Sequence, residues 1–413
     1  MSNDKEFDLV LLGATGFTGR LVAEYLLGRH GADGELKWAL AGRDEGKLAA
    51  LREELGAGKL PIVVADSHDR ASLDALVART RVVCSTVGPY ALYGSELVAA
   101  CAAAGTDYCD LTGEVPWMRR MLDAHAEAAR ASGARIVHCC GFDSIPSDIG
   151  VWFIQREAMA RLGAPLKRVR LRVERMRGTM SGGTAASMLN IITESRRDKE
   201  VGKLARNPYA LCPPDARDGI RQPYVNGAVF DPVFEAWAAP FVMAAINTRI
   251  VHRSHALLGF PWGKGFRYDE AMLTGKGFAG RRRAWTMSLA LGGFALGAAL
   301  APTRALLARL VLPKPGEGPN AEAREKGFYR LLIDGRTADG QQLRARVIGD
   351  RDPGYGSTCK MLGEAAVALA FDIDPDQPAG GFWTPATALA EPLLKRLPEH
   401  AGVTFEVIEN GKR

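Results

Sequence analysis

The sequence predicts an α/β protein in two parts: a doubly wound parallel sheet, and a second α+β domain that contains an antiparallel sheet. Short apolar runs alternate with helical patterns six times within the first 150 residues. Continuous apolar strands separated by helices are typical of a parallel sheet covered on both faces, the Rossmann-type arrangement. After residue 165 apolar and charged residues alternate, which indicates strands with one solvated face.

The apolar runs of the first part define its strands, and the segments between them have helical spacing. The predicted strands are 7–13, 38–43, 60–66, 81–89, 106–113 and 134–141. The predicted helices are 17–29, 44–56, 72–80, 94–104 and 116–132, with one more that begins after Pro146.

The second part has fewer regular patterns. Its predicted elements are strands at 166–178, 327–337, 341–350 and 401–409, and helices at 357–370 and 385–397. The strands on either side of Ala338, Asp339 and Gly340 form a predicted hairpin, and Pro385 suits the first turn of a helix. Residues 205–240 are rich in Pro, Gly and Asp and are expected to be irregular.

Composition excludes several classes of protein. The 413 residues are 47% hydrophobic and 24% charged, which excludes a mainly disordered, fibrous or polytopic membrane protein. A net charge of +6 is too small to imply nucleic-acid binding. The seven cysteines include no CxxC pair, and the N-terminus has no signal-peptide pattern, so we expect a cytoplasmic protein.

A glycine-rich turn joins the first strand to the first helix. Because it opens a strand–helix–strand unit, it predicts a dinucleotide site, in which glycines admit a pyrophosphate and the helix N-terminus offers its free amides. The residues expected to line it are Gly13, Thr15, Gly16, Phe17, Thr18 and Gly19.

Arg43 follows the end of the second strand, where an NAD site normally has an acidic residue. A guanidinium matches a 2′-phosphate in charge and geometry, which favours NADP(H). Asp44 would reverse this preference unless it caps the next helix. Further cofactor contacts are expected from the ends of the third and fourth strands, at Asp66, Val87, Gly88, Pro89 and Tyr90.

Candidate catalytic residues follow the fourth, fifth and sixth strands: Tyr90, Glu114 and Asp143. Each could supply the proton that a hydride-transfer enzyme needs. Each also has a structural alternative, since Tyr90 can bind the cofactor, Glu114 can bind a backbone turn, and Asp143 can cap a helix. No metal site is expected, and His252 and His255 are expected in a surface loop.

Residues 285–301 contain no charge, and their flanks are basic. Between 264 and 314 nine Lys and Arg residues stand against two carboxylates. Three interpretations remain open: a buried helix, peripheral contact with a membrane or lipid through 281–312, and a spanning helix.

These features give an expected domain organisation. Residues 1–150 form the NADP-binding domain, and 151–354 form an α+β substrate or dimerisation domain that includes the apolar helix. Residues 355–413 supply helices and a strand that pack back on the first domain.

The segments GATGFTGRLVAEYL, WALAGRDEGKL, STVGPYALYGSELVAAC, DLTGE and GFDSIPSDIG resemble, in order and spacing, the saccharopine dehydrogenase-like oxidoreductases. Ser181–Thr184 and GYGSTCKMLGEAAVALA extend the resemblance over most of the chain. The branch it resembles is that of the trans-acting enoyl reductases.

The resemblance implies NADPH-dependent reduction of an α,β double bond on a lipid or polyketide acyl chain that a separate synthase presents. Two alternatives stay open: a saccharopine-type amino-acid dehydrogenase, and a non-catalytic NADP-binding protein at membranes or lipid. A homodimer and a peripheral position at the inner membrane face are also compatible with the sequence.

Overall fold

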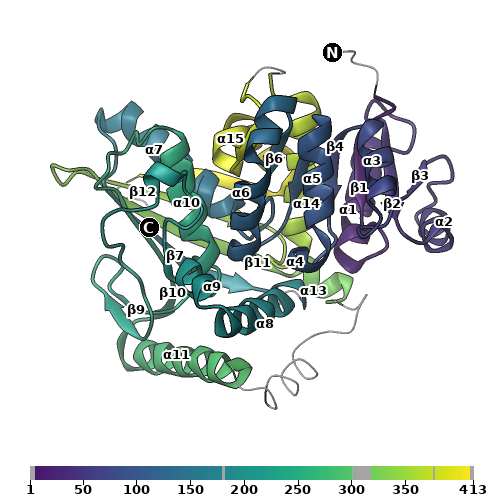
Figure 1. Ribbon diagram of the computed structural model, residues 1–413. Helices are drawn as coiled ribbons and strands as arrows, with labels where there is room; N and C mark the ends of the chain where they lie inside the picture. Colours follow the sequence, from purple (N-terminus) through teal and green to yellow (C-terminus); the bar gives the residue numbers. More distant parts are fainter. Residues whose placement is uncertain (1–4, 179–181, 300–302, 304–317, 375–376, 410–413) are drawn as a thin grey trace. The chain divides into compact units, whose positions relative to one another are not determined.

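The computed structural model describes residues 5–178, 182–299, 303, 318–374 and 377–409 (Figure 1). They belong to two compact units. The first takes the described residues of Met1–Asp143, Pro313–Pro319 and Gly354–Ala401. The second takes those of Ser144–Leu312, Asn320–Pro353 and Gly402–Arg413.

The unit boundaries differ from the expected domain boundaries at 150 and 354. The helix that begins at Ile145 packs on strands of the second sheet, so it belongs to the second unit. The last strand, Val403–Ile408, pairs antiparallel with Gln342–Gly349 of that same sheet, whereas the helices of Gly354–Ala401 belong to the first unit.

The first unit contains a seven-stranded, all-parallel sheet of order β13-β6-β5-β4-β1-β2-β3. The strands are β1 (Phe7–Leu12), β2 (Trp38–Gly42), β3 (Ile62–Val64), β4 (Thr80–Ser85), β5 (Asp107–Asp110), β6 (Arg135–Val137) and β13 (Gly381–Trp383). All six strands predicted for this sheet are confirmed. The sequence missed β13, which has only three residues and pairs with β6 at one edge.

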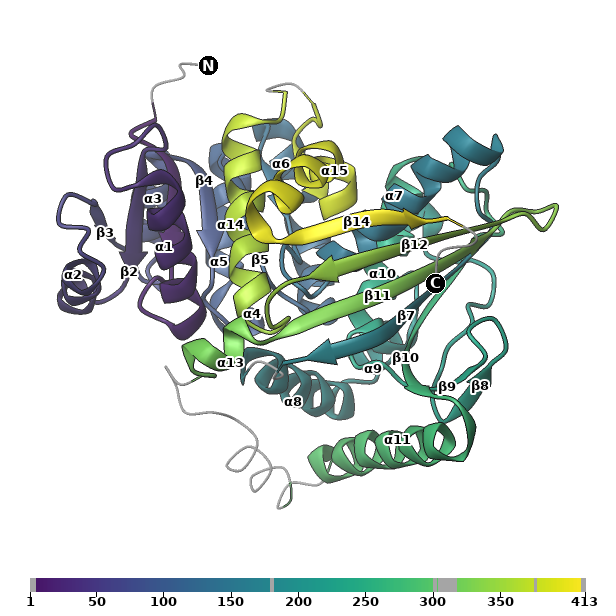
Figure 2. The same ribbon diagram turned by 180° about the vertical axis from the view of Figure 1, so that it is seen from behind.

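Helices cover both faces of this sheet. They are α1 (Phe17–His30), α2 (Glu45–Glu54), α3 (Arg70–Ala78), α4 (Tyr90–Tyr93), α5 (Ser95–Ala104), α6 (Val115–Ser132), α14 (Gly356–Phe371), α15 (Pro385–Arg396) and the π-helical turn η2 (Leu397–Ala401). Figure 1 shows α3, α5 and α6 on one face, and Figure 2 shows α1 and α14 on the other. The strands between them are therefore buried almost throughout, as their apolar sequences predict.

The second unit contains a mixed seven-stranded sheet of order β14-β12-β11-β7-β10-β9-β8. Its strands are β7 (Arg168–Arg177), β8 (Val229–Asp231), β9 (Ala236–Ala239), β10 (Arg267–Gly275), β11 (Phe328–Arg336), β12 (Gln342–Gly349) and β14 (Val403–Ile408). The predicted hairpin is confirmed, since β11 and β12 pair antiparallel. The β7–β10 pair is parallel, and the other pairs are antiparallel.

The helices of the second unit are α7 (Ile145–Leu162), α8 (Gly182–Arg197), α9 (Lys199–Arg206), the 3-10 turn η1 (Pro214–Ala216), α10 (Ala244–Leu257), α11 (Gly277–Ala299) and α13 (Ala321–Glu325). Helix α7 packs on β11, β12 and β14, and α10 packs on α7 and β10. The segment 205–240, expected to be irregular, includes the short edge strands β8 and β9. These strands lack a strong period-2 pattern, which is why the sequence missed them.

Helix α11 overturns one interpretation of the apolar segment. Trp285, Leu289 and Leu296 are 49%, 68% and 72% exposed, so this helix is not buried in the second domain. Among the described residues, no helix is long and apolar enough to cross a membrane. Residues 300–302 and 304–312 of the predicted contact segment lie outside the described residues.

The placement of His252 and His255 in a surface loop is wrong. Both residues are buried on α10, and His255 stacks on Trp262 with ring centroids 4.7 Å apart. Burial lowers the pKa of His252 to about 3, so its imidazole is neutral at pH 7. These histidines therefore act as aromatic packing groups of the second unit.

Candidate cofactor and active site

The glycine turn after β1 is closely packed against both α1 and the end of β4. Gly13 has a φ of +90°, and a Cβ there would lie 2.7 Å from the Thr86 Oγ1 atom. A Cβ on Gly19 would lie 2.1 Å from the Gly13 carbonyl oxygen. Only glycine fits either position, because one requires a left-handed backbone and the other a direct helix-to-turn contact. The Thr86 hydroxyl donates to the Gly13 carbonyl at 3.1 Å and holds the turn in place.

The N-terminus of α1 is suited to a phosphate. Gly16 is its N-cap, no side chain caps it, and its first turn contains no acidic residue. The amides of a first helical turn have no partner within the helix and carry the positive end of the helix dipole. Thr15 and Gly16 are exposed, and Phe17 and Thr18 are half-buried. The structure thus brings together the residues predicted to hold the pyrophosphate.

Asp44 and Arg43, at the end of β2, have different roles. The Asp44 carboxylate accepts from the Lys47 backbone N–H at 3.0 Å and caps α2. Arg43 is exposed, and the described residues include no hydrogen-bond or ion-pair partner for it. The carboxylate that would select a ribose 2′-OH is therefore engaged in the helix, while a guanidinium remains for a 2′-phosphate. Asp66 is half-buried after β3 and accepts from the His68 N–H at 2.9 Å.

Arg43→Ala is expected to weaken NADPH binding about tenfold to a hundredfold and to leave NADH binding nearly unchanged. The loss corresponds to roughly 1.5–3 kcal/mol of charge-assisted hydrogen bonding to the 2′-phosphate. Fluorescence titration with each nucleotide gives the ratio of the NADH and NADPH dissociation constants. Asp44→Ala is the matched control: it removes a helix cap worth about 1 kcal/mol and should preserve the NADPH preference. Equal losses for the two nucleotides with Arg43→Ala would refute the assignment.

Tyr90 follows the predicted segment Val87–Pro89 and is buried. Its hydroxyl donates to the Ser85 carbonyl at 3.0 Å, and its ring lies 5.5 Å from that of Trp117. Burial and the nearby Asp110 carboxylate raise the pKa of Tyr90 well above its usual value. A hydroxyl that is bonded to the backbone and is so weakly acidic is poorly placed to release a proton. The geometry favours a structural role for Tyr90.

Glu114 is also engaged with the backbone. Its two carboxylate oxygens accept from the N–H groups of Tyr90 and Ala91 at 2.8 and 3.0 Å. It therefore caps the first turn of α4, directly after the expected nicotinamide segment. The structure brings the predicted residues Tyr90 and Glu114 together, with Glu114 in the backbone-binding arrangement of its structural alternative.

A buried polar cluster joins the ends of β5 and β6. The Asp110 carboxylate accepts from the Tyr108 hydroxyl at 2.9 Å and lies 2.7 Å from the Nδ1 atom of His138. Its other oxygen accepts from the N–H groups of Thr112 and Cys139 at 3.1 and 3.2 Å. Cys139 has a φ of 64°, which is uncommon for a side chain other than glycine. Asp110 thus connects the two loops that follow these strands.

Asp143 is the predicted acid that remains available. It is half-buried at the end of the loop after β6, and no side-chain hydrogen bond joins it to another residue of the described segments. Burial raises the pKa of Asp143 to about 7, and the Asp110 charge adds to this effect. Such a carboxyl exchanges protons near neutral pH. Ser144, not Asp143, precedes α7, and it makes no capping bond through its side chain.

In the described part of the chain, no group of three or more His, Cys, Asp or Glu side chains is placed to hold a metal ion. The dinucleotide site instead fits an organic cofactor with phosphates. Its evidence is the glycine packing, the uncapped α1 and Arg43.

Comparison with known proteins agrees with this geometry. Residues 9–137 match the family model of the saccharopine dehydrogenase NADP binding domain. The cofactor is therefore NADP, and the protein is an NAD(P)-dependent oxidoreductase.

Relatives match along nearly the whole chain. A Mycobacterium tuberculosis protein named a putative trans-acting enoyl reductase is 43% identical, over 97% of this chain and 97% of that protein. A trans-acting enoyl reductase of Mycobacterium ulcerans is 39% identical, over 96% of this chain and 97% of its own length. A solved apo saccharopine dehydrogenase from Saccharomyces cerevisiae shares the fold, with a TM-score of 0.53, 13% identity, and coverage of 97% and 99%. The chain thus belongs to the saccharopine dehydrogenase-like oxidoreductases, in the branch of the trans-acting enoyl reductases.

Proposed function

We propose that this protein reduces the α,β double bond of an acyl thioester, a lipid or polyketide intermediate that a separate synthase presents. The observation that carries the proposal is the full-length similarity to proteins named trans-acting enoyl reductases. The NADP site supports it, because reduction of the conjugated bond needs a hydride donor. When bound, NADPH would supply the hydride for the β-carbon and become NADP⁺, and a proton would be added at the α-carbon.

Different residues of the chain would bind the cofactor, position the loop after β4 and supply the proton. Gly13, Gly16 and Gly19 let the backbone approach the pyrophosphate, and Arg43 binds the 2′-phosphate. Glu114 and Tyr90 fix the loop after β4, where the nicotinamide of a doubly wound domain is expected. Asp143 gives the proton to the α-carbon, since it is the candidate whose carboxyl is free of structural bonds to other described residues and titrates near pH 7.

The direct test is reduction of a long-chain 2-enoyl thioester by the purified protein with NADPH deuterated at C4. We expect NADPH consumption and one deuterium at the β-carbon of the saturated product. Oxidation or formation of saccharopine-like adducts, with no turnover of enoyl thioesters, would refute the proposal in favour of an amino-acid dehydrogenase. Delivery of the substrate on a synthase carrier domain should lower KM, if a synthase presents the chain.

Asp143→Asn is expected to lower kcat at least about a hundredfold, because a positioned general acid contributes roughly 10²–10⁴ to a rate. In the parent enzyme, kcat should be constant below pH 7 and fall above it, because Asp143 must be protonated to act and its pKa is about 7. The variant should lose this limb of the pH profile. Its NADPH affinity serves as the control and should stay within about twofold of the parent value. An unchanged profile would exclude Asp143 as the acid.

Asp143 also gives a stability prediction with a fixed sign. Its pKa is raised from 3.8 to about 7 in the folded chain, so the unfolded state loses this proton first as the pH rises. The associated stability is complete below pH 3.8 and is lost as the pH approaches 7. Asp143→Asn should therefore raise the unfolding midpoint at pH 8 relative to the parent, as denaturant titration would show. A lowered midpoint at that pH would contradict the raised pKa.

The cytoplasmic location and the homodimer stay predictions. Both are compatible with an enzyme that receives its substrate from a separate synthase.

A further inference from the structure

Helix α11 carries a row of exposed apolar side chains. Phe278, Trp285, Leu289 and Leu296 are 80%, 49%, 68% and 72% exposed. Their spacings of seven, four and seven residues place all four on one face of the helix. From the first to the last, this apolar row is about 27 Å long at a rise of roughly 1.5 Å per residue. Isolated exposed leucines are ordinary, but an aligned row that includes Phe and Trp indicates a contact surface.

The same helix has a strong positive charge at its beginning. Arg281, Arg282 and Arg283 are exposed, and within the described segments none of them has an ion-pair partner. The helix contains no Asp or Glu. Lys276, just before the helix, pairs with Glu235 at 3.1 Å, so that carboxylate is already engaged. The arginine cluster therefore lacks an anionic partner in the part of the chain that the structure describes.

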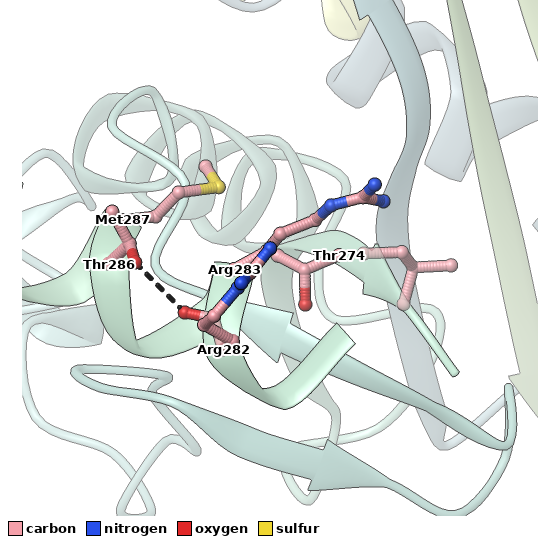
Figure 3. Close-up of a pocket in the computed structure, with 6 residues that line it drawn as sticks. Thr274, Arg282, Arg283, Thr286 and Met287 are labelled. Carbon is pink, nitrogen blue, oxygen red and sulfur yellow. Dashed lines mark hydrogen bonds between the residues drawn. The ribbon is translucent and has the colours of Figure 1, made fainter. Parts of the chain in front are cut away.

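A pocket of about 400 Å³ lies where α11 meets β10, and two of these arginines line it (Figure 3). Its lining residues are Leu273, Thr274, Arg282, Arg283, Thr286 and Met287. Both hydroxyls bond to the backbone: Thr286 donates to the Arg282 carbonyl at 3.0 Å, and Thr274 lies 2.9 Å from the Gly280 carbonyl. The groups left for a ligand are thus two guanidinium groups beside apolar carbon, which suit a phosphate attached to an aliphatic chain.

We propose that α11 docks on an anionic membrane surface, with the apolar row in the outer acyl layer and Arg281–Arg283 at the lipid phosphates. An anionic bilayer interface supplies both complements that this helix lacks, namely negative charge and an apolar layer. Exposed Trp and Phe next to arginines are typical of helices that lie in the interface plane. Each arginine near such a surface contributes about 1 kcal/mol of attraction. The proposal does not depend on the reaction that the first unit catalyses.

Vesicle flotation of the full-length chain tests the docking. The protein should float with vesicles of phosphatidylcholine and phosphatidylglycerol, and should remain unbound with pure phosphatidylcholine. Raising the salt concentration should weaken binding, since exposed charges are screened. The double variants Arg281→Glu/Arg282→Glu and Trp285→Ser/Leu289→Ser should each bind at least about tenfold more weakly.

Matched control variants distinguish an effect of the α11 surface from a general effect of charge or of exposed apolar side chains. Arg161→Glu/Lys326→Glu makes the same charge change on α7 and at the C-cap of α13, and Met159→Ser/Tyr224→Ser removes exposed apolar groups elsewhere in the second unit. Both controls should float like the parent. All four variants alter exposed side chains, so their unfolding midpoints and NADPH affinities should match those of the parent.

Three results would overturn the proposal. The first is no flotation with anionic vesicles, and the second is equal loss in test and control variants. The third is a lipid-free dimer, seen by sedimentation, that the α11 variants abolish, which would make this face an interface between two copies of the chain. Activity on a soluble enoyl thioester is measured in parallel, so a failure of docking is distinguishable from a failure of the proposed reaction.

Discussion

Gly19→Ala should weaken NADPH binding at least about a hundredfold, the largest effect expected for any single substitution in the cofactor site. The new Cβ would lie 2.1 Å from the Gly13 carbonyl oxygen and 2.8 Å from the Thr86 Oγ1 atom. The first of these atoms belongs to the backbone, so the helix itself has to move away from the glycine turn. The movement displaces the amides that face the pyrophosphate, and each tenfold loss corresponds to about 1.4 kcal/mol.

Fluorescence titration with NADPH measures this loss, and Gly28→Ala on the same helix is its control. Gly28 lies in α1 as well, but a Cβ there would meet no atom within 4 Å. Alanine has the higher helix propensity, so this variant should be as stable as the parent or more stable by up to about 1 kcal/mol, with unchanged NADPH affinity. If both variants bind NADPH normally, α1 does not hold the pyrophosphate.

The sequence predicts the first sheet well because its signals are local. Five of the six predicted strands contain a nearly continuous apolar run, which burial on both faces of a parallel sheet favours; the exception is 106–113, whose core carries Asp107 and Asp110. The glycine turn is also visible in the sequence, because Gly13, Gly16 and Gly19 follow one another where the first strand passes into the first helix. In contrast, β8, β9 and β13 have three or four residues each and are held by pairing with distant strands, which single-sequence patterns do not contain.

The sequence could not distinguish the three candidate catalytic residues from one another. Tyr90, Glu114 and Asp143 have the same sequence signature, a polar side chain after an apolar strand. The structure separates them, since Glu114 and Tyr90 bind backbone groups and Asp143 binds no other described side chain. The hydrogen bonds of Glu114 reach backbone groups 24 and 23 positions away, at Tyr90 and Ala91. No local pattern can specify them.

The apolar segment near residue 290 illustrates a different limit. Its composition predicts a helix correctly, but composition does not determine which residues are covered. The structure shows that the large side chains Trp285, Leu289 and Leu296 are exposed, whereas Ala284 and Ala298 are buried. Ala284 and Ala298 thus face the rest of the second unit, whereas Trp285, Leu289 and Leu296 do not, which is the reverse of an ordinary amphipathic core helix.

Asp110→Asn should lower the free energy of unfolding by about 3 kcal/mol, the largest stability effect expected in the first unit. The buried Asp110 carboxylate accepts from Tyr108, Thr112 and Cys139 and lies against His138 Nδ1. An amide replaces one acceptor oxygen with a donor, so at least one buried donor loses its partner. An unsatisfied buried group costs roughly 1–3 kcal/mol, and hydrogen bonds to a charged group are worth about 1.5–3 kcal/mol.

A graded series distinguishes this cluster from nonspecific core damage. Tyr108→Phe removes one donor and keeps the ring, so it should cost only about 1 kcal/mol. Asp74→Asn on α3 changes a carboxylate that is 55% exposed and paired with Arg70, and should cost less than about 1 kcal/mol. Urea denaturation of the three variants measures their free energies of unfolding and so tests this order. Because Asp110 fixes the loop that leads from Cys139 to Asp143, Asp110→Asn should also lower kcat about tenfold with little change in NADPH affinity. Equal unfolding free energies for Asp110→Asn and Asp74→Asn would show that the carboxylate does not hold these loops together.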